Sequence, residues 1–320
     1  MVVILALAGG CWWYANEQGD WYHWTIGLLL LSATLYQFYR ILPYTSIWAK
    51  SSIGLPRDRA ELRLMVSNVL QTNDKSELLI NLVRREQPDL LLTVETNEWW
   101  EKQLDEALGE DYPHAVRVPL DNLYGMHLYS RMELEDPQVT YRVKDDIPGI
   151  ETTIQLASGK EIDLYFVHPM PPSPTEAYAS TSRDAELIMV GKKVKEAGRT
   201  AIVAGDLNDV AWSHSTRLFR KISGLSDPRL GRGLYSTFHA DHWWARWPLD
   251  HIFHSHDLGV GRLQRLESIG SDHFPILIEL GLLEKDVAPI KSSVQEEEKQ
   301  EAEHKMRLGQ RGETATLLVG

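Results

Sequence analysis

The stretch TAIVAGDLND (200–209) decides the fold. Its first half is a short apolar run that ends in glycine, a pattern typical of a buried strand. Asp206 and Asn208 follow at once, so an acid and an amide stand at the carboxyl end of this strand. Ligands commonly bind at the carboxyl ends of strands in layered sheet proteins. The stretch therefore predicts a central strand with a polar site at its end.

Similar runs recur on both sides of this strand. They are LRLMVSNV (62–69), DLLLTVE (89–95), YGMHLYSR (124–131), ETTIQLA (151–157), EIDLYFVH (161–168), PLDHIFHS (248–255) and HFPILIEL (273–280). Helical patterns predict helices at 74–87, 99–108 and 175–197. Asp74 and Glu77 resemble a capping box at the start of the first helix. This mixture predicts packed sheets with helices outside, an α/β or α+β layered domain.

Acids, amides and imidazoles stand at the ends of these strands. The set is Asn68, Glu95, His168, Asp206, Asn208, Asp250, His251, Asp272 and His273. Clusters at equivalent ends of several strands predict one common cleft. Carboxylates, amide oxygens and imidazoles without cysteine suit a hard cation, Mg²⁺ or Mn²⁺, rather than structural zinc. They also suit phosphoester hydrolysis, in which an acid activates water and N–H donors stabilise the phosphoryl oxygens.

Several of these residues have a structural alternative. Asn68 could cap a turn after its strand, and Asp206 with Asn208 could form an Asx-turn. His251 is expected to be structural because it points the opposite way from Asp250 along a strand. Glu95 follows a run of apolar residues, where an unpaired carboxylate is costly to bury, and this favours a ligand role.

The motifs also carry a resemblance to a known family. SNVL (67–70), PDLLLTVET (88–96), VAGDLNDVAWS (203–213), RWPLDHIF (246–253) and GSDHFPILIEL (270–280) occur in the order found in the endonuclease/exonuclease/phosphatase family. The sequence resembles that family over roughly residues 60–281, and SGLSDPRLGRGLYSTFHA (223–240) is similar to its bacterial membrane-anchored branch. The resemblance implies an α+β fold, a four-layer α/β/β/α sandwich of the DNase I-like type, and a metal-dependent hydrolase acting on phosphoester bonds.

The resemblance also implies roles for individual residues. Glu95 would be the principal metal carboxylate, with Asn68 and Asp272 in or beside the coordination shell. Asp206 would position and activate the attacking water. The phosphate would be contacted by His168, Asn208 and His273. Asp250 would accept from the other ring nitrogen of His273 and hold that ring protonated.

The substrate is less constrained than the chemistry. A net charge of −12, from 45 acidic and 33 basic residues, argues against long-range attraction to a polyanion such as DNA. A lipid headgroup or a small phosphoester is therefore favoured, and a DNA or RNA nuclease and a catalytically idle binding domain are the alternatives. The tryptophans could stack on bases, enter a membrane surface or pack in the core, and they are Trp99, Trp100, Trp243, Trp244 and Trp247. No obligate protein partner is predicted.

The segments on either side of this domain differ from it. Residues 1–60 are expected to anchor the chain, with a transmembrane helix at about 21–40 and a possible further apolar segment at 1–16. Basic residues after the helix place the catalytic domain, 61–281, on the cytoplasmic side of a bacterial inner membrane. Residues 282–320 are charged and predict a solvated tail or loose helix. The single cysteine, Cys11, excludes an intrachain disulfide.

Overall fold

The computed structural model describes residues 9–10, 21–171, 177–284 and 295–311. The chain divides into two units, each described here by itself. One comprises Met1–Lys50 and Leu230–Gly233, and the other comprises Ser51–Arg229 and Leu234–Gly320. The second unit holds two β-sheets and every strand-end residue predicted from the sequence.

The strands form one six-stranded and one five-stranded sheet. The first has the order β10-β11-β1-β2-β4-β3, with bounds Leu258–Arg265, Ile276–Leu282, Leu62–Asn68, Leu90–Val94, Met126–Ser130 and His114–Val118. The second has the order β5-β6-β7-β8-β9, with bounds Glu135–Tyr141, Pro148–Gln155, Glu161–Phe166, Ala201–Asp206 and Asp250–His254. The expected strands are all present, and β3, β5 and β10 are additional.

Strand pairing brings the polar strand ends together within each sheet. In the first sheet β1 runs parallel to β2 with Asn68 opposite Val94, so Glu95 follows directly beside Asn68. In the second sheet β8 runs antiparallel to β9 with Asp206 opposite Asp250. The register alone therefore places one pair of polar side chains at the end of each sheet, Asn68 with Glu95 in the first and Asp206 with Asp250 in the second.

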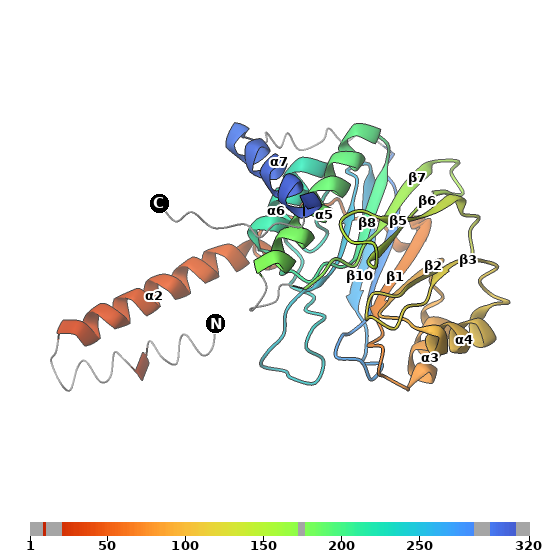
Figure 1. Ribbon diagram of the computed structural model, residues 1–320, viewed down its shortest axis with the longest axis horizontal. Coiled ribbons are helices and arrows are strands. Elements are labelled where there is room, and N and C mark those ends of the chain that lie inside the picture. The colour runs from red at the N-terminus through yellow and green to blue at the C-terminus, as the bar shows by residue number, and fades with distance from the viewer. Residues whose placement is uncertain (1–8, 11–20, 172–176, 285–294, 312–320) are drawn as a thin grey trace. The chain divides into compact units, whose positions relative to one another are not determined.

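Apolar side chains fill three layers in this unit. The largest cluster lies between the two sheets and includes Val66, Leu92 and Ile202. The outer face of the first sheet packs under helices α3 (Ser76–Glu86) and α4 (Glu98–Leu108). The outer face of the second sheet packs under α5 (Ala177–Ala197) and α6 (His214–Ser223), on the opposite side of the sandwich from α3 and α4 (Figure 1). The predicted α/β/β/α sandwich is confirmed.

One helix start differs from the prediction. The residue before α3 is Lys75, and no side chain caps this end of the helix. Asn73 Oδ1 instead accepts from the Lys75 amide, and Asn73 Nδ2 donates to the carbonyls of Val69 and Ile269. The expected capping box at Asp74 is therefore wrong, because the turn formed by Asn73 delays the helix by two residues.

The charged C-terminal segment forms a helix, α7 (Glu296–Arg311). Its Ala302 is buried and contacts Ile188 of α5 and Leu218 of α6. Lys305 donates to Asp184 of α5 at 3.0 Å. The segment expected as a solvated tail or loose helix thus contributes a packed face to the second unit.

The first unit contains α2 (Trp21–Ile41), followed by a short 3-10 helix at Leu42–Tyr44. The stretch Trp24–Tyr44 is long and apolar enough to cross a membrane, and only 6% of it is buried. The Gly231 amide donates to the Pro43 carbonyl at 2.9 Å within the same unit. The further apolar segment expected at 1–16 lies outside the described residues, apart from Gly9 and Gly10.

Candidate active site

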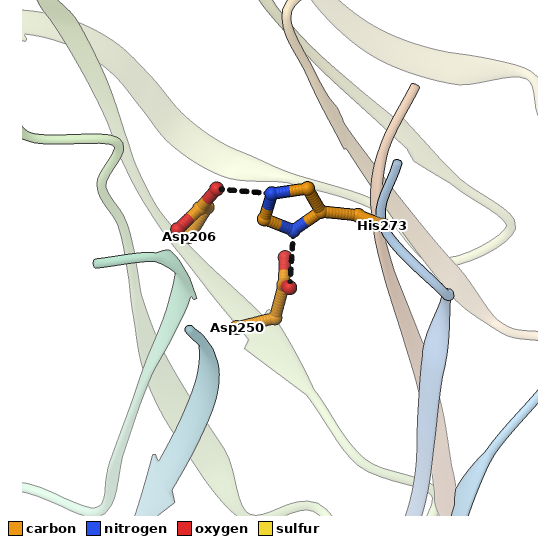
Figure 2. Close-up of side chains that lie close together, drawn as sticks. All are labelled: Asp206, Asp250 and His273. Atoms are coloured by element: carbon orange, nitrogen blue, oxygen red, sulfur yellow. Dashed lines mark hydrogen bonds and ion pairs between the residues drawn. The ribbon is translucent and has the colours of Figure 1, made fainter. Parts of the chain in front are cut away.

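His273 lies between two aspartates at the end of the sandwich (Figure 2). Its Nδ1 is 2.8 Å from Oδ2 of Asp250 on β9, and its Nε2 is 3.6 Å from Oδ2 of Asp206 on β8. His273 precedes β11 and thus comes from the other sheet. The three side chains are almost fully buried. Their ligand atoms lie within 4.8 Å of one another, so side chains from both sheets meet at this point.

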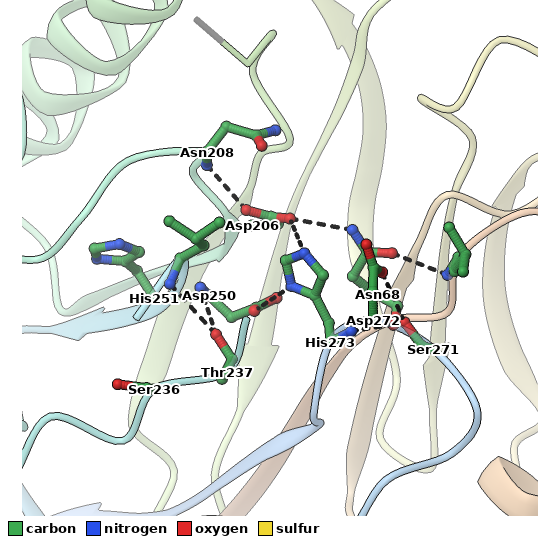
Figure 3. A network of polar contacts seen from close by, with 12 residues as sticks. Asn68, Asp206, Asn208, Ser236, Thr237, Asp250, His251, Ser271, Asp272 and His273 are labelled. Atoms are coloured by element: carbon green, nitrogen blue, oxygen red, sulfur yellow. Dashed lines mark hydrogen bonds and ion pairs between the residues drawn. The ribbon is translucent and has the colours of Figure 1, made fainter. Parts of the chain in front are cut away.

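Asn68 links the two acids predicted for metal binding and water activation. Its Nδ2 donates to Glu95 Oε1 at 2.7 Å and to Asp206 Oδ2 at 3.1 Å, and Figure 3 shows the second of these contacts. Its Oδ1 accepts from the Leu70 amide at 3.0 Å. Asn68 therefore caps the turn, as the structural alternative predicts, and the same side chain also contacts Glu95 and Asp206.

Glu95 leaves strand geometry at the point where its carboxylate turns toward the site. Its φ is 61°, which is rare for a residue with a side chain. Gly125 lies against the next residue, where an added Cβ would stand 1.6 Å from the Thr96 carbonyl oxygen. This close approach allows the β2 end to bend beside the start of β4.

The charges in this cluster reinforce one another. Burial lowers the pKa of His273, but Asp250 and Asp206 outweigh it and raise that pKa to about 10. Burial raises the pKa of Asp206, but the His273 charge and the N–H groups of Asn208 and Asn68 hold it below its ordinary value. At neutral pH the pair is therefore an imidazolium beside a carboxylate.

Glu95 has a different electrostatic environment. Burial, and then the nearby Asp206 carboxylate, raise the pKa of Glu95 to about 7, although the hydrogen bond from Asn68 opposes this shift. Among the described residues, no lysine or arginine forms an ion pair with Glu95. A desolvated carboxylate without a basic partner is stabilised by a divalent cation. Glu95 and Asp272 thus offer the carboxylate oxygens that Mg²⁺ or Mn²⁺ prefers, whereas Asn68 directs its Nδ2 donor at Glu95 and uses its Oδ1 in the turn.

Glu95 is not part of the group of residues whose potential ligand atoms lie within 4.8 Å of one another. Asp206, Asp250 and His273 form that group. His273 has both ring nitrogens directed at carboxylates, and its raised pKa keeps it protonated, so it is a poor cation ligand. Glu95 lies outside this group and accepts a hydrogen bond from Asn68.

The remaining predicted residues surround Asp206. The Asn208 amide donates to Asp206 Oδ1 at 2.9 Å (Figure 3), which is the Asx-turn named as the structural alternative, and Asn208 Nδ2 donates to the Pro169 carbonyl. His168 Nε2 is 4.0 Å from Asp206 Oδ2, and burial lowers the pKa of His168. Asp272 is half-buried, and its Oδ1 accepts from the Ser271 hydroxyl at 3.4 Å.

His251 is structural, as expected. Its Nε2 contacts the Asp209 carbonyl oxygen at 2.8 Å, and its Nδ1 contacts Arg229. Arg229 is buried and forms a two-point ion pair with Asp227. Burial and the neighbouring Arg229 lower the pKa of His251 to about 3, so the ring is neutral. Its side chain points away from the cluster around His273 (Figure 3).

Three residues outside the predicted set support the site. Thr237 Oγ1 accepts from the Asp250 amide at 3.2 Å. Ser271 Oγ accepts from the His273 amide and donates to the Asn68 carbonyl at 2.9 Å. Arg183, on α5, donates to the Asn208 carbonyl at 3.1 Å. Ser271 stands in the GSDHF motif and could have been found there, but Thr237 carries no local signal.

The sequence profile of the Endonuclease/Exonuclease/phosphatase family matches residues 65–273. The chain belongs to this family, as its motifs and its two-sheet sandwich indicate. No curated protein matches the sequence as a relative.

Solved structures show the same fold. The catalytic domain of human Nocturnin with bound sulfate anion has a TM-score of 0.57 and 17% identity, covering 73% of this chain and 98% of that one. TDP2 from D. rerio, complexed with a single strand DNA product, has a TM-score of 0.58 and 16% identity over 69% and 98%. A family member from Bacteroides thetaiotaomicron has a TM-score of 0.55 and 20% identity over 68% and 97%. At such identities the similarity shows the fold alone.

Proposed function

We propose that this chain is a divalent-metal-dependent phosphoesterase that hydrolyses a phosphodiester or phosphomonoester by in-line attack of water. The observation that carries the proposal is the single network in which Asn68 bridges Glu95 and Asp206, while His273 bridges Asp206 and Asp250. The network combines the Glu95 carboxylate, which suits a cation, the Asp206 carboxylate, which suits a water molecule, and the protonated imidazole of His273.

In this proposal Glu95 holds Mg²⁺ or Mn²⁺, and Asn68 and Asp272 lie in or beside its coordination shell. The bound cation would neutralise charge on the phosphoryl oxygens. Asp206, kept ionised by its neighbours, accepts the proton of the attacking water. His273 donates to a phosphoryl oxygen, and Asp250 fixes the ring and keeps it protonated.

Asn208 and His168 flank the same carboxylate. The Asn208 amide orients Asp206, and its side chain donates to the phosphoryl oxygens as negative charge grows there. The neutral His168 ring, with Nδ1 buried and without a hydrogen-bond partner among the described residues, binds the phosphate. An idle binding domain is disfavoured because every member of this set is present.

The favoured substrate is a lipid headgroup or a small phosphoester at a bacterial inner membrane, with the catalytic unit on the cytoplasmic side. Support comes from the apolar helix, from the acidic net charge of −12 and from the basic residues that follow the helix. Digestion of the unit by protease in inverted membrane vesicles, but not in right-side-out vesicles, is the result expected for this orientation.

A nuclease of the same chemistry is the second candidate. Trp243 and Trp244 are 79% and 70% exposed, so core packing is the wrong interpretation for them, whereas Trp100 is fully buried. Exposed indole rings stack on unpaired bases. The similar D. rerio TDP2 structure contains a single strand DNA product.

One panel of substrates tests both candidates. The full chain in detergent is given a chromogenic phosphodiester, mixed liposomes or plasmid DNA, each with Mg²⁺ or with a chelator. We expect chelator-sensitive turnover of the chromogenic ester and release of headgroup products. Nicking of DNA at physiological salt without lipid turnover would favour the nuclease, and turnover that persists with the chelator would contradict metal dependence.

A further inference from the structure

An open pocket lined by arginines lies beside Phe274, the residue that directly follows His273. It has a volume of about 480 Å³, and Arg57, Arg246, Arg262 and Arg265 line it together with Tyr235 and Ser236. Four guanidinium groups at one pocket are unusual in a chain whose net charge is −12. Like charges gathered at one pocket repel one another, and a bound anion relieves that repulsion.

Two acids near the pocket, Glu86 and Glu279, are already paired with arginines. Arg262 lies 2.8 Å from Glu86 and 3.7 Å from Glu279, and Arg63 also contacts Glu279 at 3.2 Å. Arg262 is therefore neutralised. Within the described part of the chain, the other arginines of the pocket have no acidic partner, and they are Arg57, Arg246 and Arg265.

Two of these cations lie against one aromatic ring. The Arg265 guanidinium is 4.3 Å from the centroid of Phe274, and that of Arg246 is 5.1 Å from it. Nη1 of Arg265 donates to the Ser236 carbonyl, whereas Nε of Arg246 is buried without a hydrogen-bond partner among the described residues. Burial and the charge of Arg246 lower the pKa of Arg265. The two charges thus repel each other where solvent screens them only partly.

The pocket shares its backbone with the candidate active site. Phe274 follows His273 directly, and its amide donates to the Thr237 carbonyl at 2.8 Å. Thr237 in turn holds the Asp250 amide through its hydroxyl. Ser236, at the pocket, is the neighbour of Thr237. A ligand in the pocket would therefore stabilise the same two segments that hold His273 and Asp250.

We propose that Arg57, Arg246 and Arg265 form a binding site for a phosphate oxyanion, either free phosphate or the phosphodiester of a lipid headgroup. Planar guanidinium groups bind phosphate oxygens through paired, charge-assisted hydrogen bonds. A phosphate group relieves the repulsion between the unpaired cations and accepts from their guanidinium N–H groups. This binding site does not depend on hydrolysis, so its test needs no turnover.

Arginine modification tests the site directly in the full chain. The protein, in non-ionic detergent with a chelator, is treated with phenylglyoxal in chloride or in inorganic phosphate at equal ionic strength. Peptide mass spectrometry then measures the modification of each arginine. We expect phosphate to slow modification of Arg57, Arg246 and Arg265 roughly tenfold. Arg59, which pairs with Glu284, is the internal control and should react equally in both salts.

The source of the phosphate group is distinguished in membranes. The same reaction is run in vesicles of phosphatidylcholine alone or with added phosphatidylglycerol. Protection only by phosphatidylglycerol assigns the site to a lipid headgroup, and protection only by inorganic phosphate assigns it to a soluble ligand. If neither protects these arginines relative to Arg59, the proposal is wrong.

Substitutions give a second readout. Arg265→Gln should abolish the protection of Arg57 by phosphate, whereas the control Arg59→Gln should retain it. Protection of Arg57 that is undiminished in Arg265→Gln would overturn the proposal. Thermal unfolding confirms that each variant is folded, and if Arg265→Gln does not fold, the protection pattern of the unmodified sequence decides.

Discussion

The imidazole Nδ1 of His273 lies 2.8 Å from Asp250 Oδ2, although the two residues belong to different sheets. His273 lies just before β11 of the first sheet, and Asp250 begins β9 of the second. The contact can form only when the sheets pack face to face. The candidate site is therefore assembled by the packing of the two sheets against each other.

Asp250→Asn should move the alkaline limb of the pH–rate profile to lower pH. Asp250 is the strongest of the groups that raise the pKa of His273 to about 10. Without its charge that pKa falls, and the protonated donor is lost at a lower pH. The dependence of kcat/KM on pH measures this shift. The exposed Asp241→Asn is the control, and an unmoved alkaline limb in Asp250→Asn would remove the proposed role of the pair.

Asp206→Asn should lower kcat by about 10²- to 10⁴-fold, the usual contribution of a general base. The amide keeps the shape of the side chain but cannot accept the proton of the attacking water. Steady-state hydrolysis of a chromogenic phosphodiester with Mg²⁺ measures the effect, and circular dichroism confirms the fold. Activity within a few-fold of the unmodified protein would show that another group activates the water.

Gly205→Ala should destabilise the second unit by roughly 3 kcal/mol or more. Gly205 has a φ of 144°, and an added Cβ would lie 1.9 Å from the Val167 carbonyl oxygen. Gly198 is the matched control, because its φ is also positive, at 62°, but nothing lies within 4 Å of an added Cβ. Gly198→Ala should cost only about 1 kcal/mol. Chemical denaturation compares the two, and equal losses would contradict the importance of the close approach.

His127→Phe should stabilise the protein in mild acid. The His127 side chain is fully buried, and neither ring nitrogen has a hydrogen-bond partner among the described residues. Burial lowers the pKa of His127 to about 4. Between roughly pH 6.5 and 4 the unfolded chain therefore binds a proton that the folded chain does not, and stability falls as the pH falls.

Removing this proton uptake should raise the free energy of unfolding near pH 5 by about 2 kcal/mol relative to neutral pH. Denaturant titrations at the two pH values measure the difference. His304→Phe, at an exposed position of α7, should leave the pH dependence unchanged. If His127→Phe leaves it unchanged as well, the buried ring does not titrate as described.

Strand patterns predicted packed sheets with helices outside, because buried strands are short apolar runs with sharp boundaries, and the family resemblance supplied the four-layer sandwich. Asp206 and Asn208 could be placed for the same reason, since each directly follows such a run. By contrast, β5 was missed because Glu135–Tyr141 is largely exposed and lacks an apolar run. The cap of α3 was predicted wrongly because the turn depends on the contact of Asn73 with Ile269, nearly two hundred residues away.

Other features of the site depend on tertiary packing alone. Neither the positive φ of Glu95 nor the hydrogen bond from Thr237 to the Asp250 amide has a local signature in the sequence. Arg246, in a loop, and Arg265, at the end of β10, likewise lie over the same Phe274 ring although they are distant from each other in the sequence. Such contacts follow from the way in which the two sheets meet.

The central claim is that Glu95 holds the divalent cation on which hydrolysis depends. Binding of Mn²⁺, followed by electron paramagnetic resonance in the full chain, tests it most directly, with the exposed Glu98→Gln as control. We predict that Glu95→Gln weakens Mn²⁺ binding roughly 100-fold and abolishes hydrolysis, while Glu98→Gln changes neither. Mn²⁺ binding of unchanged affinity in Glu95→Gln would contradict the account.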